Sequence, residues 1–355
     1  MPLAAEQPQQ RSHVCYPLAH RALIAHGIRA LTLEQLLMSS FGKIVLLVLL
    51  VPSIAYASWQ EWFEQRNHLF YLRGPWNGSV YYKLPELYTE FNGIDFGHAH
   101  LAETLLRTDD ATAVEQARQE IVSFIESKPT TPPDEAVIAP TFHRLVWTTQ
   151  NVFEQAHQLH RDLYDLFATD TVQDKEAAYK QILAHYLAQP LAITPLPLDH
   201  ANALWNFPES RRFVQRFPKL NAQIWVYHWL QAKIAELQME RTVAAQRQAL
   251  PAILTEYHEH LNTPPLQWTF MPLFAEIAPT FSQRFPDAAN IFDNLHMLHD
   301  NLDDVLSSPE RFPTMEAKRK RIYELLEVYL HRNHQPGDQR YLSYRAPAGS
   351  HHYHH

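Results

Sequence analysis

The chain has 355 residues, of which 46% are hydrophobic and 19% are charged, a composition typical of a folded globular protein. The formal net charge of −8 and the absence of a dense Lys/Arg run argue against a nucleic-acid partner. A single cysteine, Cys15, excludes disulfides within the chain, iron–sulfur clusters and cysteine-rich zinc sites.

The first strong feature along the chain is a hydrophobic segment at residues 41–58. Ile44 to Val51 are all aliphatic, Lys43 precedes them, and small residues end the segment at Ala57. The pattern predicts either a signal peptide cleaved after Ala57 or an uncleaved transmembrane anchor. Both place the remainder on the far side of a membrane, in the periplasm if the source is a Gram-negative bacterium. A buried core helix of a cytosolic protein is the third interpretation.

Residues 1–40, before this segment, are then a cytoplasmic tail or follow from a start codon assigned too far upstream. Residues 59–83 form an aromatic-rich connector that can rest on the membrane, contact a protein partner or simply pack in the core.

An internal repeat occupies most of the remaining chain. Ile138-Ala-Pro-Thr-Phe142 recurs 139 residues later as Ile277-Ala-Pro-Thr-Phe281, and 12 of 31 positions are identical between 138–168 and 277–307. Unrelated segments would share about two. The sequence therefore predicts a tandem duplication, with the following segments: repeat 1 at 84–189, a proline-rich connector at 190–216, repeat 2 at 217–333 and a disordered His-rich tail at 334–355.

Each repeat is expected to contain four helices, which makes the whole an all-α bundle. Glycine is scarce, at 8 residues, which disfavours the tight turns of sheets, and 25 prolines lie mostly between periodic stretches. The expected helices are 84–107, 110–127, 140–168 and 173–188 in repeat 1, and 217–247, 249–262, 286–306 and 314–333 in repeat 2.

Histidines and carboxylates recur on these helices at metal-ligand spacing. A carboxylate and a histidine three residues apart share one helical face, and several such positions are predicted to face a common interior between the repeats. The candidate metal ligands are Asp95, His98, Glu154, His157, His160, His228, Asp293, His296 and His299. On a helical wheel Glu154 and His160 lie about 120° apart, so these two are not expected to bind the same ion.

The spaced pairs Asp95/His98, Glu154/His157 and Asp293/His296 resemble the Glu-x-x-His motifs of ferritin-like di-iron carboxylate proteins. That resemblance implies an iron site in a helix bundle. The chain departs from the pattern by having aspartate in two of the three pairs and by having more histidine. Imidazole and carboxylate ligands together also suit manganese or zinc.

Two functional hypotheses follow. The first is an exported or membrane-anchored metal-binding protein, of the di-iron oxidoreductase type, with its site between the repeats. The second is a non-catalytic periplasmic accessory or assembly subunit that binds a protein partner and whose histidines are hydrogen-bonded core residues. Metal storage is a weaker third option. No nucleotide-binding motif and no Cys-x-x-Cys-His for covalent haem is found in the sequence.

Overall fold

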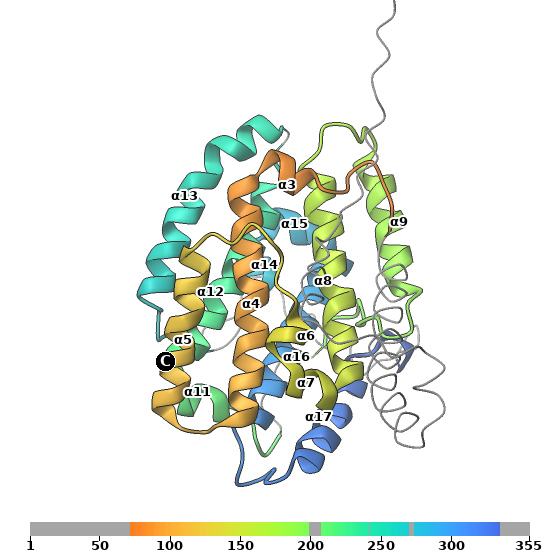
Figure 1. Ribbon diagram of the computed structural model, residues 1–355. Helices are drawn as coiled ribbons and strands as arrows, with labels where there is room; N and C mark the ends of the chain where they lie inside the picture. The colour runs from red at the N-terminus through yellow and green to blue at the C-terminus, as the bar shows by residue number, and fades with distance from the viewer. Residues whose placement is uncertain (1–71, 199–206, 241, 270–272, 334–355) are drawn as a thin grey trace, which may run out of the picture. The chain divides into compact units, whose positions relative to one another are not determined.

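The computed structural model describes residues 72–198, 207–240, 242–269 and 273–333, which form helices and no β-strand (Figure 1). The prediction of an all-α protein is therefore confirmed for these residues. The hydrophobic segment 41–58 and the tail 334–355 lie outside them. Among the described helices, none is long and apolar enough to cross a membrane.

Among the described residues, seven helices before the proline-rich connector correspond in order to seven helices after it. The first set, here called the first half, is α3 (Ser79–Lys83), α4 (Pro85–Arg107), α5 (Ala111–Glu126), α6 (Glu135–Ile138), α7 (Pro140–Leu145), α8 (Trp147–Phe167) and α9 (Lys175–Leu187). The second half is α11 (Arg212–Arg216), α12 (Pro218–Leu237), α13 (Val243–Asn262), α14 (Phe274–Ile277), α15 (Pro279–Arg284), α16 (Pro286–Leu306) and α17 (Met315–Tyr329). In the first half α4 contacts α5 and α8 contacts α9. In the second half α12 contacts α13 and α16 contacts α17 in the same way.

Carboxylates fix the short helices in the same way in both halves. Asp165 in α8 accepts two backbone N–H groups from the start of α3, and Asp304 in α16 accepts two from the start of α11, all at 2.7–2.8 Å. Glu103 in α4 accepts two from the first turn of α7, and Glu236 in α12 accepts two from α15, at 2.9–3.1 Å. These bonds satisfy N–H groups that a helix start otherwise leaves without an acceptor.

The short helices are where the structure departs from the sequence prediction. The helix expected at 140–168 is broken at Val146 into α7 and α8, and the one expected at 217–247 ends at Leu237. A new helix then starts after Thr242, whose side chain caps its first turn. Proline is the first residue of α7, α12, α15 and α16. Proline would break the interior of a helix, but at the first position it favours the start of one.

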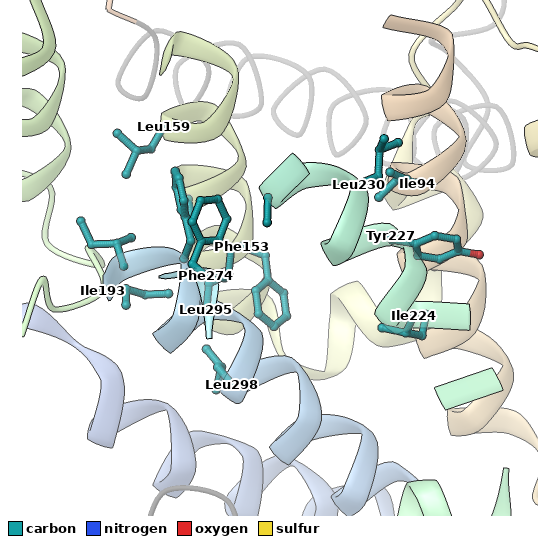
Figure 2. Packing of buried hydrophobic residues seen from close by; sticks show 14 of the residues in the cluster. Ile94, Phe153, Leu159, Ile193, Ile224, Tyr227, Leu230, Phe274, Leu295 and Leu298 are labelled. Atoms are coloured by element: carbon teal, nitrogen blue, oxygen red, sulfur yellow. The ribbon is translucent and has the colours of Figure 1, made fainter. Parts of the chain in front are cut away.

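The hydrophobic core is continuous across both halves. Figure 2 shows Phe153 of α8 close to Leu295 of α16, and Ile94 of α4 close to Leu230 of α12. Buried polar groups add fixed contacts between the halves: the Tyr164 hydroxyl donates to the carbonyl of Gln231 at 3.0 Å. α16 contacts both α4 and α8, which brings the predicted ligand-bearing helices together.

Candidate metal centre

Six histidine side chains from four helices are in ring contact with one another in the interior. The contacting ring centroids are 4.0–6.4 Å apart. The residues are His98 of α4, His157 and His160 of α8, His228 of α12, and His296 and His299 of α16. Both halves contribute to this cluster, here called the histidine cluster.

Within the histidine cluster, His98, His228 and His299 each offer a ring nitrogen, and these nitrogens all lie within 4.8 Å of one another. The Nε2 atoms of His98 and His228 are 3.3 Å apart. Two nitrogens that bind one zinc-like ion at about 2.0–2.1 Å with near-tetrahedral angles lie about 3.3 Å apart. The separation therefore fits two ligands of one metal ion as well as it fits a hydrogen bond between the rings.

The close approach of α4 and α12 depends on a glycine beside the first ligand. A Cβ atom on Gly97 would lie 3.0 Å from the Tyr227 ring and 3.1 Å from the Ile121 side chain. Gly97 precedes His98 and Tyr227 precedes His228. A larger side chain at this position would separate the two helices that carry these histidines.

Burial favours the neutral form of five of the six histidines. It lowers the pKa of His98 to about 3, with a smaller effect from nearby His157. Burial likewise lowers the pKa values of His157, His160, His228 and His299, and neighbouring histidines lower the last three further. Neutral imidazole is the form that binds metal ions.

Several buried ring nitrogens in the cluster have no hydrogen-bond partner among the described residues. They are Nδ1 of His98, His157, His228 and His299, and Nε2 of His160. A buried polar atom without a partner costs roughly 1–3 kcal/mol. These nitrogens are therefore open to a water molecule or an ion, and Nδ1 of His98 and His228 lies on the other side of each ring from the Nε2 atoms that are 3.3 Å apart.

A second group of ligands lies beside the cluster, entirely within the first half. Asp95, Glu135 and His157 bring ligand atoms within 4.8 Å of one another, and so do Glu135, His143 and Glu154. Glu135 belongs to both sets. These five residues come from α4, α6, α7 and α8 and are here called the carboxylate cluster.

The carboxylate cluster brings three carboxyl groups together in a place that is partly buried. Burial raises the pKa of Glu135 well above its usual value, and the charges of Glu154 and Asp95 raise it further. Arg161 forms an ion pair with Asp95, whose charge is the main cause of the raised Arg161 pKa. One guanidinium therefore faces three carboxylates.

A small cavity connects the two clusters. It has a volume of about 40 Å³ and is lined by His98, His157, His299 and Glu135 together with apolar walls such as Phe153. Since one water needs about 10–15 Å³, there is room for an ion with a few water molecules or a diatomic ligand, but not for a large substrate.

The structure divides the predicted ligands between these clusters. His98, His228 and His299 come together as a set from both halves. The expected pair Asp95/His98 is separated, because Asp95 joins the carboxylate cluster while His98 joins the histidines. Glu154 and His157 likewise lie in different sets that share Glu135.

Three predicted ligands lie outside both the set His98, His228 and His299 and the carboxylate cluster. Asp293 accepts the backbone N–H of Phe274 at 2.7 Å and so fixes the start of α14. His160 packs on Phe292, with ring centroids 3.7 Å apart, and His296 stacks on His228 at 4.0 Å. His160 and His296 thus support the cluster as packed rings.

Sequence reasoning missed Glu135 and His143. Glu135 lies on a short helix that was not predicted, and His143 lies in the part of the predicted helix 140–168 that forms the separate helix α7. Neither is three residues from another ligand on a long helix. A usable signal was present in the repeat itself: His143 directly follows the repeated Ile-Ala-Pro-Thr-Phe segment, and Glu135 lies three residues before it.

Comparisons with protein-family models, with curated proteins and with solved structures find no match to this chain.

Proposed function

We propose that this protein is a metalloprotein in which His98, His228 and His299 hold one transition-metal ion between the two halves. The observation that supports it most directly is the convergence of three neutral ring nitrogens within 4.8 Å, two of them 3.3 Å apart. The buried nitrogens without partners and the adjoining 40 Å³ cavity add to this support.

Three histidines leave at least one coordination position open, as catalytic metal sites do. That position would face the cavity, where water or dioxygen fits. Carboxylates beside the imidazoles favour iron or manganese, and zinc is the further alternative. With iron, the proposed reaction class is oxidation–reduction on a small ligand.

The centre is proposed to result from a tandem duplication. The repeated sequence, the matched order of seven helices and the paired capping carboxylates Asp165/Asp304 and Glu103/Glu236 support this. One ion would then lie between two related halves. We further propose from the hydrophobic sequence at 41–58 that the domain is exported or anchored facing the periplasm.

The test is metal analysis of the full chain after purification without a metal-affinity column. The four histidines of the tail (351, 352, 354 and 355) are replaced by alanine in every sample, so that they bind nothing. The wild-type site is expected to retain about one equivalent of metal through dialysis against a weak chelator. The His228→Gln/His299→Gln double variant should bind the metal at least about tenfold more weakly.

His258→Gln is the matched control, because His258 pairs with Glu90 away from the cluster. Circular dichroism establishes that each variant is folded. If the wild type binds neither Fe²⁺, Mn²⁺ nor Zn²⁺ more tightly than the folded double variant does, the proposal is wrong.

The second candidate function, an accessory subunit that binds a protein partner, is supported by a surface groove. It has a volume of about 1230 Å³ and lies between the start of α4 and α13, where Leu250 and Leu254 give it an apolar wall. Tyr82 at its rim is 71% exposed. A stable complex that is lost on Leu254→Asp, with no metal bound, would favour this function over the first.

A further inference from the structure

We propose that the carboxylate cluster is a second metal site, in which Glu135 bridges two divalent cations. One ion would be bound by Asp95, Glu135 and His157, and the other by Glu135, His143 and Glu154. The two ligand sets share only Glu135, and a carboxylate has two oxygens, so each oxygen can bind one ion.

The ligand chemistry specifies the class of ion. Three carboxylates and two imidazoles are oxygen-rich ligands of the kind that suit manganese and iron, whereas thiolate-preferring ions find no sulfur ligand in the cluster. Two-metal sites hold their ions about 3.5–4 Å apart, a spacing that one bridging carboxylate spans.

The ligands are already held by neighbouring groups in the way that metal ligands usually are. His143 is 2% exposed, and its Nδ1 lies 2.8 Å from the carbonyl oxygen of Ala139. Donation from Nδ1–H to that carbonyl would fix the tautomer and the orientation of the His143 ring, as such bonds do for histidine ligands. The side-chain amide of Gln150 donates to Glu135 at 2.7 Å and holds that carboxylate in place.

Charge in the cluster also favours cations. Asp95, Glu135 and Glu154 all lie close enough to the Arg161 guanidinium to raise its pKa, and Asp95 forms an ion pair with it. The Arg161 side chain is 50% exposed, so it can move towards solvent when an ion takes its place on Asp95. The two ions would then lie among the carboxyl groups of Asp95, Glu135 and Glu154.

This second site extends the proposed function but does not depend on it. His98 and His157 have ring centroids 6.1 Å apart, so the histidine site and the carboxylate site would share one cavity. No residue is a ligand in both, because the histidine set contains only His98, His228 and His299. Each site can therefore be removed by substitution without touching a ligand of the other.

The experiment is electron paramagnetic resonance of the full chain titrated with Mn²⁺ alone after chelator treatment. Two bridged Mn²⁺ ions are exchange-coupled and give a multiline spectrum, whereas an isolated Mn²⁺ gives six lines. The wild type should show the coupled spectrum. Glu135→Gln should abolish it, and His143→Gln should leave one uncoupled ion and reduce the bound Mn²⁺ by about one equivalent.

Asp293→Asn is the matched control for Glu154→Gln, since Asp293 holds the corresponding position of the second half and caps α14. Asp293→Asn should keep the coupled spectrum, and Glu154→Gln should lose it. The same spectrum should survive in His228→Gln/His299→Gln, which separates this proposal from the histidine site. A wild type that shows only six-line Mn²⁺, or coupling that persists in folded Glu135→Gln, would overturn the inference.

Discussion

In the first half, α6 begins with Glu135 and α7 carries His143, whereas the residues 139 positions later in the second half are Phe274 and Ser282. The helices at these positions have the same lengths in both halves. Phe274 is 2% exposed and packs against Phe292. The same backbone arrangement thus carries a glutamate and a histidine in one half, and a buried phenylalanine and a serine in the other.

The position of Glu154 in the first half and Asp293 in the second half carries an acidic residue in both, but with different contacts. Glu154 joins the carboxylate cluster, while its counterpart Asp293 binds the backbone N–H of Phe274. Aspartate is shorter by one methylene. By contrast, the carboxylates that cap α3 and α11, Asp165 and Asp304, are the same residue type and make the same bonds. The two halves therefore share the order of their helices and the carboxylates that hold the short ones, and they differ in the side chains at the positions of the carboxylate cluster.

The largest expected effect comes from making the first half resemble the second at the helix contact. Gly97 corresponds to Leu230, so Gly97→Leu introduces the residue of the other half. Overpacking against Tyr227 and Ile121 should cost about 1–3 kcal/mol in the free energy of unfolding. It should also separate His98 from His228 and weaken metal binding at the histidine site at least about tenfold.

Urea unfolding and metal titration measure the two effects. Gly93→Leu is the control, because a side chain there meets Ile125 of α5 rather than α12. It should destabilise the chain and leave metal affinity unchanged while folded. Equal metal affinity in Gly97→Leu and the wild type would contradict the role given to this contact.

Long periodic segments made most of the fold predictable. The expected helices 84–107 and 286–306 match α4 and α16 to within one residue at each end, because apolar stripes and a proline start define them. The short helices were not predictable in the same way. α6 and α14 have four residues each, too few for a period to be seen, and they are held by tertiary contacts such as that of Asp293 with Phe274.

The candidate site was only partly predictable, for a geometric reason. Spacing along one helix identifies side chains on a common face, and it found His98 and His299, while alignment of the two repeats found His228 opposite Asp95. It cannot say which helix lies opposite. Asp95 and His98 share a helix face by spacing, yet neighbouring elements divide them between two ligand sets. Glu135 comes from a short helix that the pattern did not reveal, and His143 comes from the first part of the predicted helix 140–168, which the structure breaks at Val146.

A second test uses the pH dependence that distinguishes Asp293 from a metal ligand. Burial raises the pKa of Asp293 to about 8, well above the value of about 3.9 in an unfolded chain. The folded state therefore binds the extra proton, and this contribution to stability is full below about pH 4 and is lost as the pH rises through about 8. Asparagine has no charge to bury and keeps an oxygen for the Phe274 N–H.

Asp293→Asn should accordingly be closer to the wild type in stability at about pH 5 and more stable than it by about 1–3 kcal/mol at about pH 9. Urea midpoints at the two pH values measure the difference. A difference that stays constant with pH would be evidence against the protonated, buried aspartic acid, and loss of bound metal would return Asp293 to the list of ligands.

The smallest expected effect concerns Arg161, whose counterpart in the second half is Asp300. In the absence of an ion, Arg161 binds Asp95 with a side chain that is 50% exposed, so the pair should contribute only about 0–1 kcal/mol. A cation that binds Asp95 must displace this guanidinium. Arg161→Gln should therefore tighten Mn²⁺ binding at the carboxylate cluster by up to about fivefold, and the gain should shrink at high salt because the competing pair is screened there. Weaker Mn²⁺ binding by a folded Arg161→Gln variant would mean instead that the guanidinium holds Asp95 in position for the ion, as a support rather than a competitor.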